Sequence, residues 1–170
     1  MSATVDVYEF TSSSAGVSKT SGTVRHKKAN NTTVDAVNPL VKPSGGSYDR
    51  SFFKYVGLYC SVAPGTNIQN GKFWYDTTGS FPTGAAYYYA SVAPASWATP
   101  VQADGTGEGT TYTLADGTHA SSTNTVDLSV GTFTGTGVMG NMIMEYLRID
   151  STVAGGILTG TALNFSYDEI

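Results

Sequence analysis

The sequence predicts an all-β fold, a single-domain β-sandwich that is jelly-roll-like, and three observations support this prediction. The length of 170 residues suits one domain, on a prior of roughly 100–200 residues per domain. The chain holds 24 Thr, 18 Ser and 20 Gly, and 12% of its residues are aromatic, a composition typical of strands separated by turns. Only 13% of the residues are charged, about half the usual quarter, which argues against a helical bundle, a coiled coil or an alternating α/β enzyme.

The N-terminal part of the chain combines a strand pattern with polar, irregular sequence. Residues 4–10 indicate a strand, and the Ser- and Thr-rich residues 11–21 indicate a loop or arm that becomes ordered only against a neighbouring subunit. We therefore divide the chain into an N-terminal strand or arm, residues 1–22, and a β-sandwich domain, residues 23–170. Residues 23–28 predict a short polar edge strand, because Lys and Arg discourage edge-to-edge pairing.

The middle of the chain predicts the central strands of the sandwich. Residues 51–63 are apolar on both faces, as expected of a strand that is covered on both sides. Residues 72–76 and 85–92 predict two further strands, and residues 94–100 predict a connection. We expect the following side chains to be buried: Val56, Leu58, Phe73 and Phe165.

The C-terminal part predicts a Gly-rich loop at residues 104–111 and strands at residues 124–130 and 163–168. Residues 140–150 allow two interpretations, because their apolar positions fit an amphipathic helix and also a strand that is apolar on both faces. The β pattern around this segment favours a strand.

Charge and cysteine content exclude several classes of protein. The net charge of −4 gives no general basic surface for nucleic acid, so no nucleic-acid partner is expected. The single Cys60 excludes an internal disulfide, and a buried, unreactive thiol is the simplest interpretation. No apolar stretch approaches the roughly 18 residues of a membrane span, so no membrane association is expected. The first residues carry no signal-peptide pattern, which indicates synthesis in a cytoplasm.

Two short motifs have simple structural interpretations. Residues 25–28, Arg-His-Lys-Lys, could contact phosphate, but a solvated or partner-facing run is favoured. Residues 135–140 match G-x-G-x-x-G, yet they do not lie in the βαβ unit that a dinucleotide site requires.

We expect no catalytic, cofactor-binding or metal-binding residues, and no enzymatic activity. His26 and His119 lie in polar sequence, and no G-x-S-x-G elbow accompanies them. Asp104, Glu108 and Asp116 offer loop oxygens for Ca²⁺, but the EF-hand spacing is absent.

Aromatic residues suggest a different function, which is the binding of sugars. Trp74, Trp97 and the three tyrosines at residues 87–89 could stack on sugar rings, although core or subunit-interface positions are the more common use of such residues.

Five segments of the chain have the sequence features of a known family: residues 51–59, 66–75, 145–150, 154–156 and 163–170. They resemble a family of small structural proteins that tailed bacteriophages encode in their head or tail gene clusters. Members of this family characteristically end in a strand reading Phe-x-Tyr-Asp-Glu, which corresponds here to residues 165–169.

This resemblance implies a non-enzymatic virion structural protein, specifically a capsid decoration or auxiliary protein on the capsid surface. It also favours a strand at residues 141–150. The expected partner is the major capsid protein, bound by a homo-oligomer such as a trimer. Two alternatives stay open: a carbohydrate- or host-surface-binding β-sandwich module, and a tail or neck component.

Overall fold

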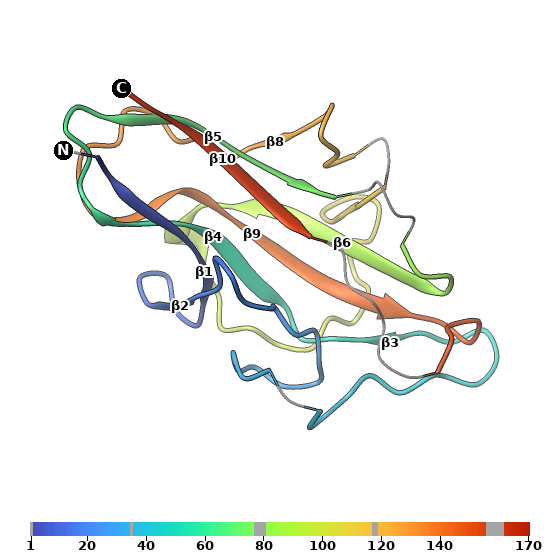
Figure 1. Cartoon of the computed structure of the whole chain (residues 1–170). Helices are drawn as coiled ribbons and strands as arrows, with labels where there is room; N and C mark the ends of the chain where they lie inside the picture. The colour runs from blue at the N-terminus through green and yellow to red at the C-terminus, as the bar shows by residue number, and fades with distance from the viewer. Residues whose placement is uncertain (1, 35, 77–80, 117–118, 156–161) are drawn as a thin grey trace.

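The computed structural model describes residues 2–34, 36–76, 81–116, 119–155 and 162–170 (Figure 1). Among these residues the regular structure is almost entirely β. The elements are β1 (Thr4–Phe10), β2 (Gly16–Ser18), β3 (Asp49–Arg50), β4 (Lys54–Val62), β5 (Ile68–Tyr75), β6 (Ala85–Val92), the 3₁₀ turn η1 (Pro94–Ser96), β7 (Thr113–Leu114), β8 (Val126–Asp127), β9 (Gly137–Ile149) and β10 (Leu163–Glu169). No helix in the described part of the chain is long and apolar enough to cross a membrane.

The described strands form two antiparallel sheets that pack into a sandwich (Figure 1). The larger sheet has seven strands, in the order β2-β1-β4-β9-β6-β7, with β3 also pairing with β9. The smaller sheet has three strands, in the order β10-β5-β8. From β4 to β6 and again from β7 to β10 the chain alternates between the sheets, which gives the interleaved order of a jelly roll. The predicted all-β sandwich is therefore confirmed.

The core lies between the sheets and follows the two-residue periodicity of the strands. Val56, Leu58 and Phe73 are at most 2% exposed, as predicted, whereas Phe165 is only half-buried because β10 is the edge strand of the smaller sheet. The outer face of the larger sheet is covered as well, since Tyr55 contacts Trp97 and Tyr146 contacts Tyr112. This double cover explains why the central strands β4 and β9 are apolar on both faces.

The strand interpretation of residues 140–150 is confirmed, because β9 runs from Gly137 to Ile149. Its pairing with β4 shifts register between Val56 and Leu58, and Gly140 has a positive φ of 65° beside this shift. A Cβ at Gly140 would lie 2.3 Å from the carbonyl oxygen of Leu128. Gly140 thus permits a close approach of two chain segments, which is the structural use of the last glycine in the G-x-G-x-x-G match.

Three predictions in other segments differ from the structure. Residues 23–28 are not an edge strand, because their backbone pairs with no strand in the described residues. The predicted strand at 124–130 is reduced to β8, and Ser129 just beyond it has a positive φ of 54°. Within the segment predicted as a loop or arm, Gly16–Ser18 form β2 and pair with β1. Residue 156 of the resembling segments lies outside the described residues.

Candidate functional site

The smaller sheet covers only part of the inner face of the larger sheet, and an irregular segment covers the rest. We call this segment the strap and define it as the described residues of 19–42, none of which is in a helix or strand. The strap contacts β4 through a hydrogen bond from Lys54 to Asn31 and β6 through an edge-on contact between His26 and Tyr87. An irregular segment in this position must find hydrogen-bond partners for its own backbone.

Three buried lysines supply these partners at three successive carbonyl groups. The Nζ atoms of Lys54, Lys19 and Lys27 donate to the carbonyl oxygens of Asn31, Thr32 and Thr33, at 2.6, 2.8 and 3.0 Å. Glu9 on β1 balances part of this charge, since its carboxylate lies 2.9 Å from the Nζ of Lys54 and 3.5 Å from that of Lys19. Lys54 and the ion pair between Lys19 and Glu9 therefore fasten the strap to the sheet, while the bonds from Lys19 and Lys27 to Thr32 and Thr33 hold the strap to itself.

A second buried polar group lies where the strap meets the smaller sheet. Glu145 on β9 is fully buried, and the hydroxyl of Tyr75 donates to its Oε2 at 2.5 Å. Its Oε1 lies 3.3 Å from the Nε2 of His26, whose side chain is only 8% exposed. Burial and the neighbouring carboxylate together hold the pKa of Tyr75 well above its usual value, so this hydroxyl remains a donor.

His26, Glu145 and Ser51 have the composition of a catalytic triad but not its chemistry. The Oγ of Ser51 lies 3.5 Å from the Nδ1 of His26. That hydroxyl already donates to the carbonyl oxygen of Phe52 at 2.9 Å and accepts from the backbone N–H of Leu147 at 3.0 Å. Ser51 is also fully buried, so no substrate reaches it in this structure. A nucleophile needs a base that takes its proton, and here a backbone carbonyl holds that proton.

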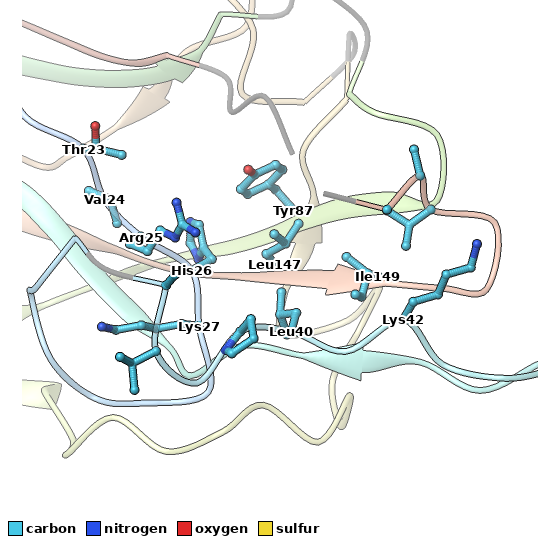
Figure 2. Close-up of a pocket in the computed structure, with 16 residues that line it drawn as sticks. Thr23, Val24, Arg25, His26, Lys27, Leu40, Lys42, Tyr87, Leu147 and Ile149 are labelled. Carbon is cyan, nitrogen blue, oxygen red and sulfur yellow. The ribbon is translucent and has the colours of Figure 1, made fainter. Parts of the chain in front are cut away.

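A cavity of about 240 Å³ lies beside this group, between the strap and the larger sheet (Figure 2). Its apolar lining comes mainly from β6, β9 and the strap, with the side chains Tyr87, Leu147, Ile149 and Leu40. Figure 2 shows Arg25 and His26 at one end of these apolar side chains and Lys42 at the other. The cavity has the usual form of a ligand site, which is an apolar hollow with a few polar groups.

The basic run at residues 25–28 differs from its predicted solvated state. Lys27 is 1% exposed, His26 pairs with Glu145, and Lys28 lies 3.1 Å from the carboxylate of Asp49. Arg25 is the exception, because it is half-buried, lines the cavity, and forms no hydrogen bond or ion pair with any described residue. The partners of these side chains lie on distant strands, so the sequence of the run alone does not show them.

The acidic residues considered for calcium do not converge on one site. The Glu108 carboxylate accepts hydrogen bonds from Arg50, Arg148 and Tyr146 at 2.6–2.9 Å. Burial opposes ionisation of Glu108, but these donors outweigh it and lower its pKa. Asp116 instead contacts His119, and the described residues contain no group of three potential metal ligands. Glu108 therefore anchors the Gly-rich loop to the outer face of the larger sheet.

The aromatic residues considered for sugar binding are mostly covered. Tyr87, Tyr88 and Tyr89 are 6%, 7% and 8% exposed, and Trp97 lies against Tyr55. Trp74 on β5 is half-buried. These positions do not form a stacking surface for a sugar ring.

No protein-family model matches this chain, and neither the curated proteins nor the solved structures contain a significant match. The function must therefore be argued from the residues and the geometry.

Proposed function

We propose that this chain is a non-enzymatic virion structural protein that binds the outer surface of a capsid and stabilises the shell by joining major capsid subunits. The observation that carries the proposal is the set of apolar side chains that the strap presents to solvent. Val34, Val37 and Val41 are 53%, 61% and 61% exposed, although they lie on a segment fastened by buried ion pairs. Exposed apolar side chains gathered on one ordered segment are typical of a protein contact surface.

The sequence resemblance to small phage structural proteins supports the same proposal. It covers the central strand β4 and the terminal strand β10, which belong to the two different sheets. The sandwich holds together without disulfides, and its one thiol, on Cys60, is buried. Such a protein suits a particle that assembles in a reducing cytoplasm.

The chemistry of the buried groups supports a role without catalysis. The Ser51 hydroxyl and the Glu108 carboxylate are both occupied by neighbouring protein groups. These two groups thus have a structural use in the part of the fold that the structure describes.

Repetition on a symmetric shell would make a modest contact effective. Each copy buries a small surface, but a homo-oligomer such as a trimer engages several capsid subunits at once. Linked contacts raise the overall avidity well above the affinity of one contact.

The test is co-sedimentation of the purified protein with empty shells of the major capsid protein encoded in the same genome. The test variant replaces Val34, Val37 and Val41 together by Ser. The matched control replaces Val17 and Val101, which are 48% and 59% exposed on other segments. We expect the wild type and the control to sediment with shells and the test variant to lose roughly tenfold or more in affinity, at an unchanged melting temperature.

Equal binding by the test variant would place the contact outside the strap and remove the observation that carries the proposal. No binding by the wild type would contradict the capsid-surface role. In that case binding to isolated tails would indicate the tail or neck position instead.

A further inference from the structure

We infer that the cavity between the strap and the larger sheet binds a small carboxylate with an apolar body, and that Arg25 is the residue that holds the carboxylate. This inference does not rest on the proposed capsid role, because it concerns a cavity within a single copy of the chain. The occupant is a free small molecule of the type of a medium-chain fatty acid.

Arg25 lies at the cavity without a described partner for its charge. Its three neighbours in the basic run are all engaged: His26 by Glu145, Lys27 by the Thr33 carbonyl and Lys28 by Asp49. Arg25 alone has no hydrogen-bond or ion-pair partner in the described residues, although it is half-buried at the cavity. The guanidinium of Arg25 is thus available to a ligand, and a carboxylate is the group whose geometry it matches through two parallel hydrogen bonds.

The charged residues that line the cavity are basic. Four basic residues line the cavity, Arg25, His26, Lys27 and Lys42, and no Asp or Glu is among its described lining residues. Glu145 lies behind His26 and is not among these lining residues: its Oε2 accepts from Tyr75, and its Oε1 lies 3.3 Å from the Nε2 of His26. The field at the cavity therefore favours an anion over a neutral or cationic ligand.

The interior of the cavity is apolar and large enough for a small ligand. Between Arg25 and Lys42 the wall is formed by Tyr87, Leu147 and Ile149 (Figure 2). The volume of about 240 Å³ exceeds the engineered cavity of roughly 150 Å³ that binds benzene. It therefore has room for an apolar body of on the order of eight carbon atoms. Burying that body is favourable, and the charged head fixes its orientation.

The cavity is already formed before a ligand binds. The strap beside the cavity is joined to the sheet by the hydrogen bond from Lys54 to Asn31 and the ion pair between Lys19 and Glu9. The ligand therefore loses little affinity to ordering this part of the protein.

The experiment is a calorimetric titration of the full chain with octanoate, with 1-octanol and octylammonium as probes of the same chain length. We expect octanoate to bind roughly tenfold or more tightly than octanol, because only octanoate offers a carboxylate to Arg25. Octylammonium is expected to show no binding. In the same titration, NMR methyl signals of Val24, Leu147 and Ile149 should shift and locate the ligand.

Two variants test the assignment, and a third serves as a control. Arg25→Gln removes the guanidinium and should weaken octanoate binding roughly tenfold while leaving octanol binding unchanged. Leu40→Trp fills the cavity from the strap and should abolish the binding of both. Lys72→Gln removes an exposed charge from β5, outside the cavity, and should change neither.

Thermal melts of each variant establish that it is folded before it is titrated. If Leu40→Trp does not fold, Arg25→Gln still decides the question, because Arg25 makes no described contact that stabilises the chain. Failure of octanoate to bind the wild type at millimolar concentration overturns the inference. So does binding to Arg25→Gln within twofold of the wild type, or methyl shifts confined to other parts of the molecule.

Discussion

The inner face of the larger sheet is covered in two ways, and the two parts of that face are built from different side chains. Under the smaller sheet the contacts are apolar, with Leu58 and Ile143 in the same core cluster as Phe73. Under the strap the sheet instead presents Glu9, Lys54 and Glu145, all 3% exposed or less.

The smaller sheet and the strap face different side chains because their backbones are hydrogen-bonded in different ways. Strands β10, β5 and β8 satisfy much of their backbone hydrogen bonding with one another, so they need only apolar contact from the facing sheet. The strap has no such partner strand, so its carbonyl groups take lysine donors from the sheet and from the strap itself. Buried charge in this protein is thus a consequence of covering a sheet with irregular chain.

The largest expected effect is that of removing one lysine from the strap side. Lys54→Met leaves the Asn31 carbonyl without this donor and deprives Glu9 of its nearest cation. We expect a loss of about 3–5 kcal/mol in the free energy of unfolding, the range for breaking a buried ion pair. Urea denaturation measures it, with Lys72→Met as the exposed control, and a loss below about 1 kcal/mol would contradict the role given to Lys54.

A comparable loss in the free energy of unfolding is expected when the apolar core between the two sheets is truncated. Leu58 is 2% exposed, and Leu58→Ala removes buried methyl groups where the two sheets meet. The expected loss is about 2–5 kcal/mol, the range for truncating a buried leucine. A change of less than about 0.5 kcal/mol in the same denaturant melts would mean that this part of the core repacks without strain.

Tyr75 joins the two parts, since it belongs to the smaller sheet and donates to Glu145. Tyr75→Phe keeps the ring in the core but withdraws the donor from a buried carboxylate. We expect a loss of about 1–3 kcal/mol, the cost of leaving such a group unsatisfied. The control is Tyr48→Phe, because Tyr48 is 47% exposed. Equal stability of both variants would show that Glu145 does not depend on Tyr75.

The smallest effect is expected on the outer face, where solvent screens the ion cluster around Glu108. The pKa of Glu108 in the folded protein is lowered: burial opposes its ionisation, but donors from Arg50, Tyr146 and Arg148 prevail. A lowered pKa stabilises the fold above the unfolded value of about 4.3, and this contribution disappears as the pH falls through the folded value.

Glu108→Gln should therefore cost roughly 1 kcal/mol at neutral pH and progressively less on acidification. Urea melts of both proteins between pH 7 and pH 3 measure the difference. A difference that stays constant or grows toward acid would assign the effect to something other than the charge of Glu108.

The contrast between the two covers also explains what the sequence could and could not predict. Strands β1, β6 and β10 follow from alternation or apolar runs, because their partners are other strands and their periodicity records a sheet. The sequence of the strap shows no such periodicity, because the side chains that anchor it come from separate parts of the chain. Residues 23–28 resemble an exposed basic strand for this reason, although His26 and Lys27 point into the protein.

A signal for the buried charges was nevertheless present in the sequence. Lys54 lies in a run of aromatic and aliphatic residues, and Glu145 follows three apolar residues. A charged residue inside a strand that is apolar on both faces requires a buried partner. The sequence indicates that such partners exist, but only the register that places Lys54 opposite Glu145 shows that both lie beneath the strap.

The pairing of β4 with β9 sets the order in which the molecule is built. These strands lie far apart along the chain, and folds dominated by such distant pairings form in milliseconds to seconds. The strap precedes both strands in the sequence, but its anchors Lys54 and Glu145 are in place only after they have paired. During synthesis the strap therefore emerges early and stays undocked until β9 has been made. The strap depends on this pairing and not the reverse, so we expect amide protons of residues 29–33 to exchange before those of β4.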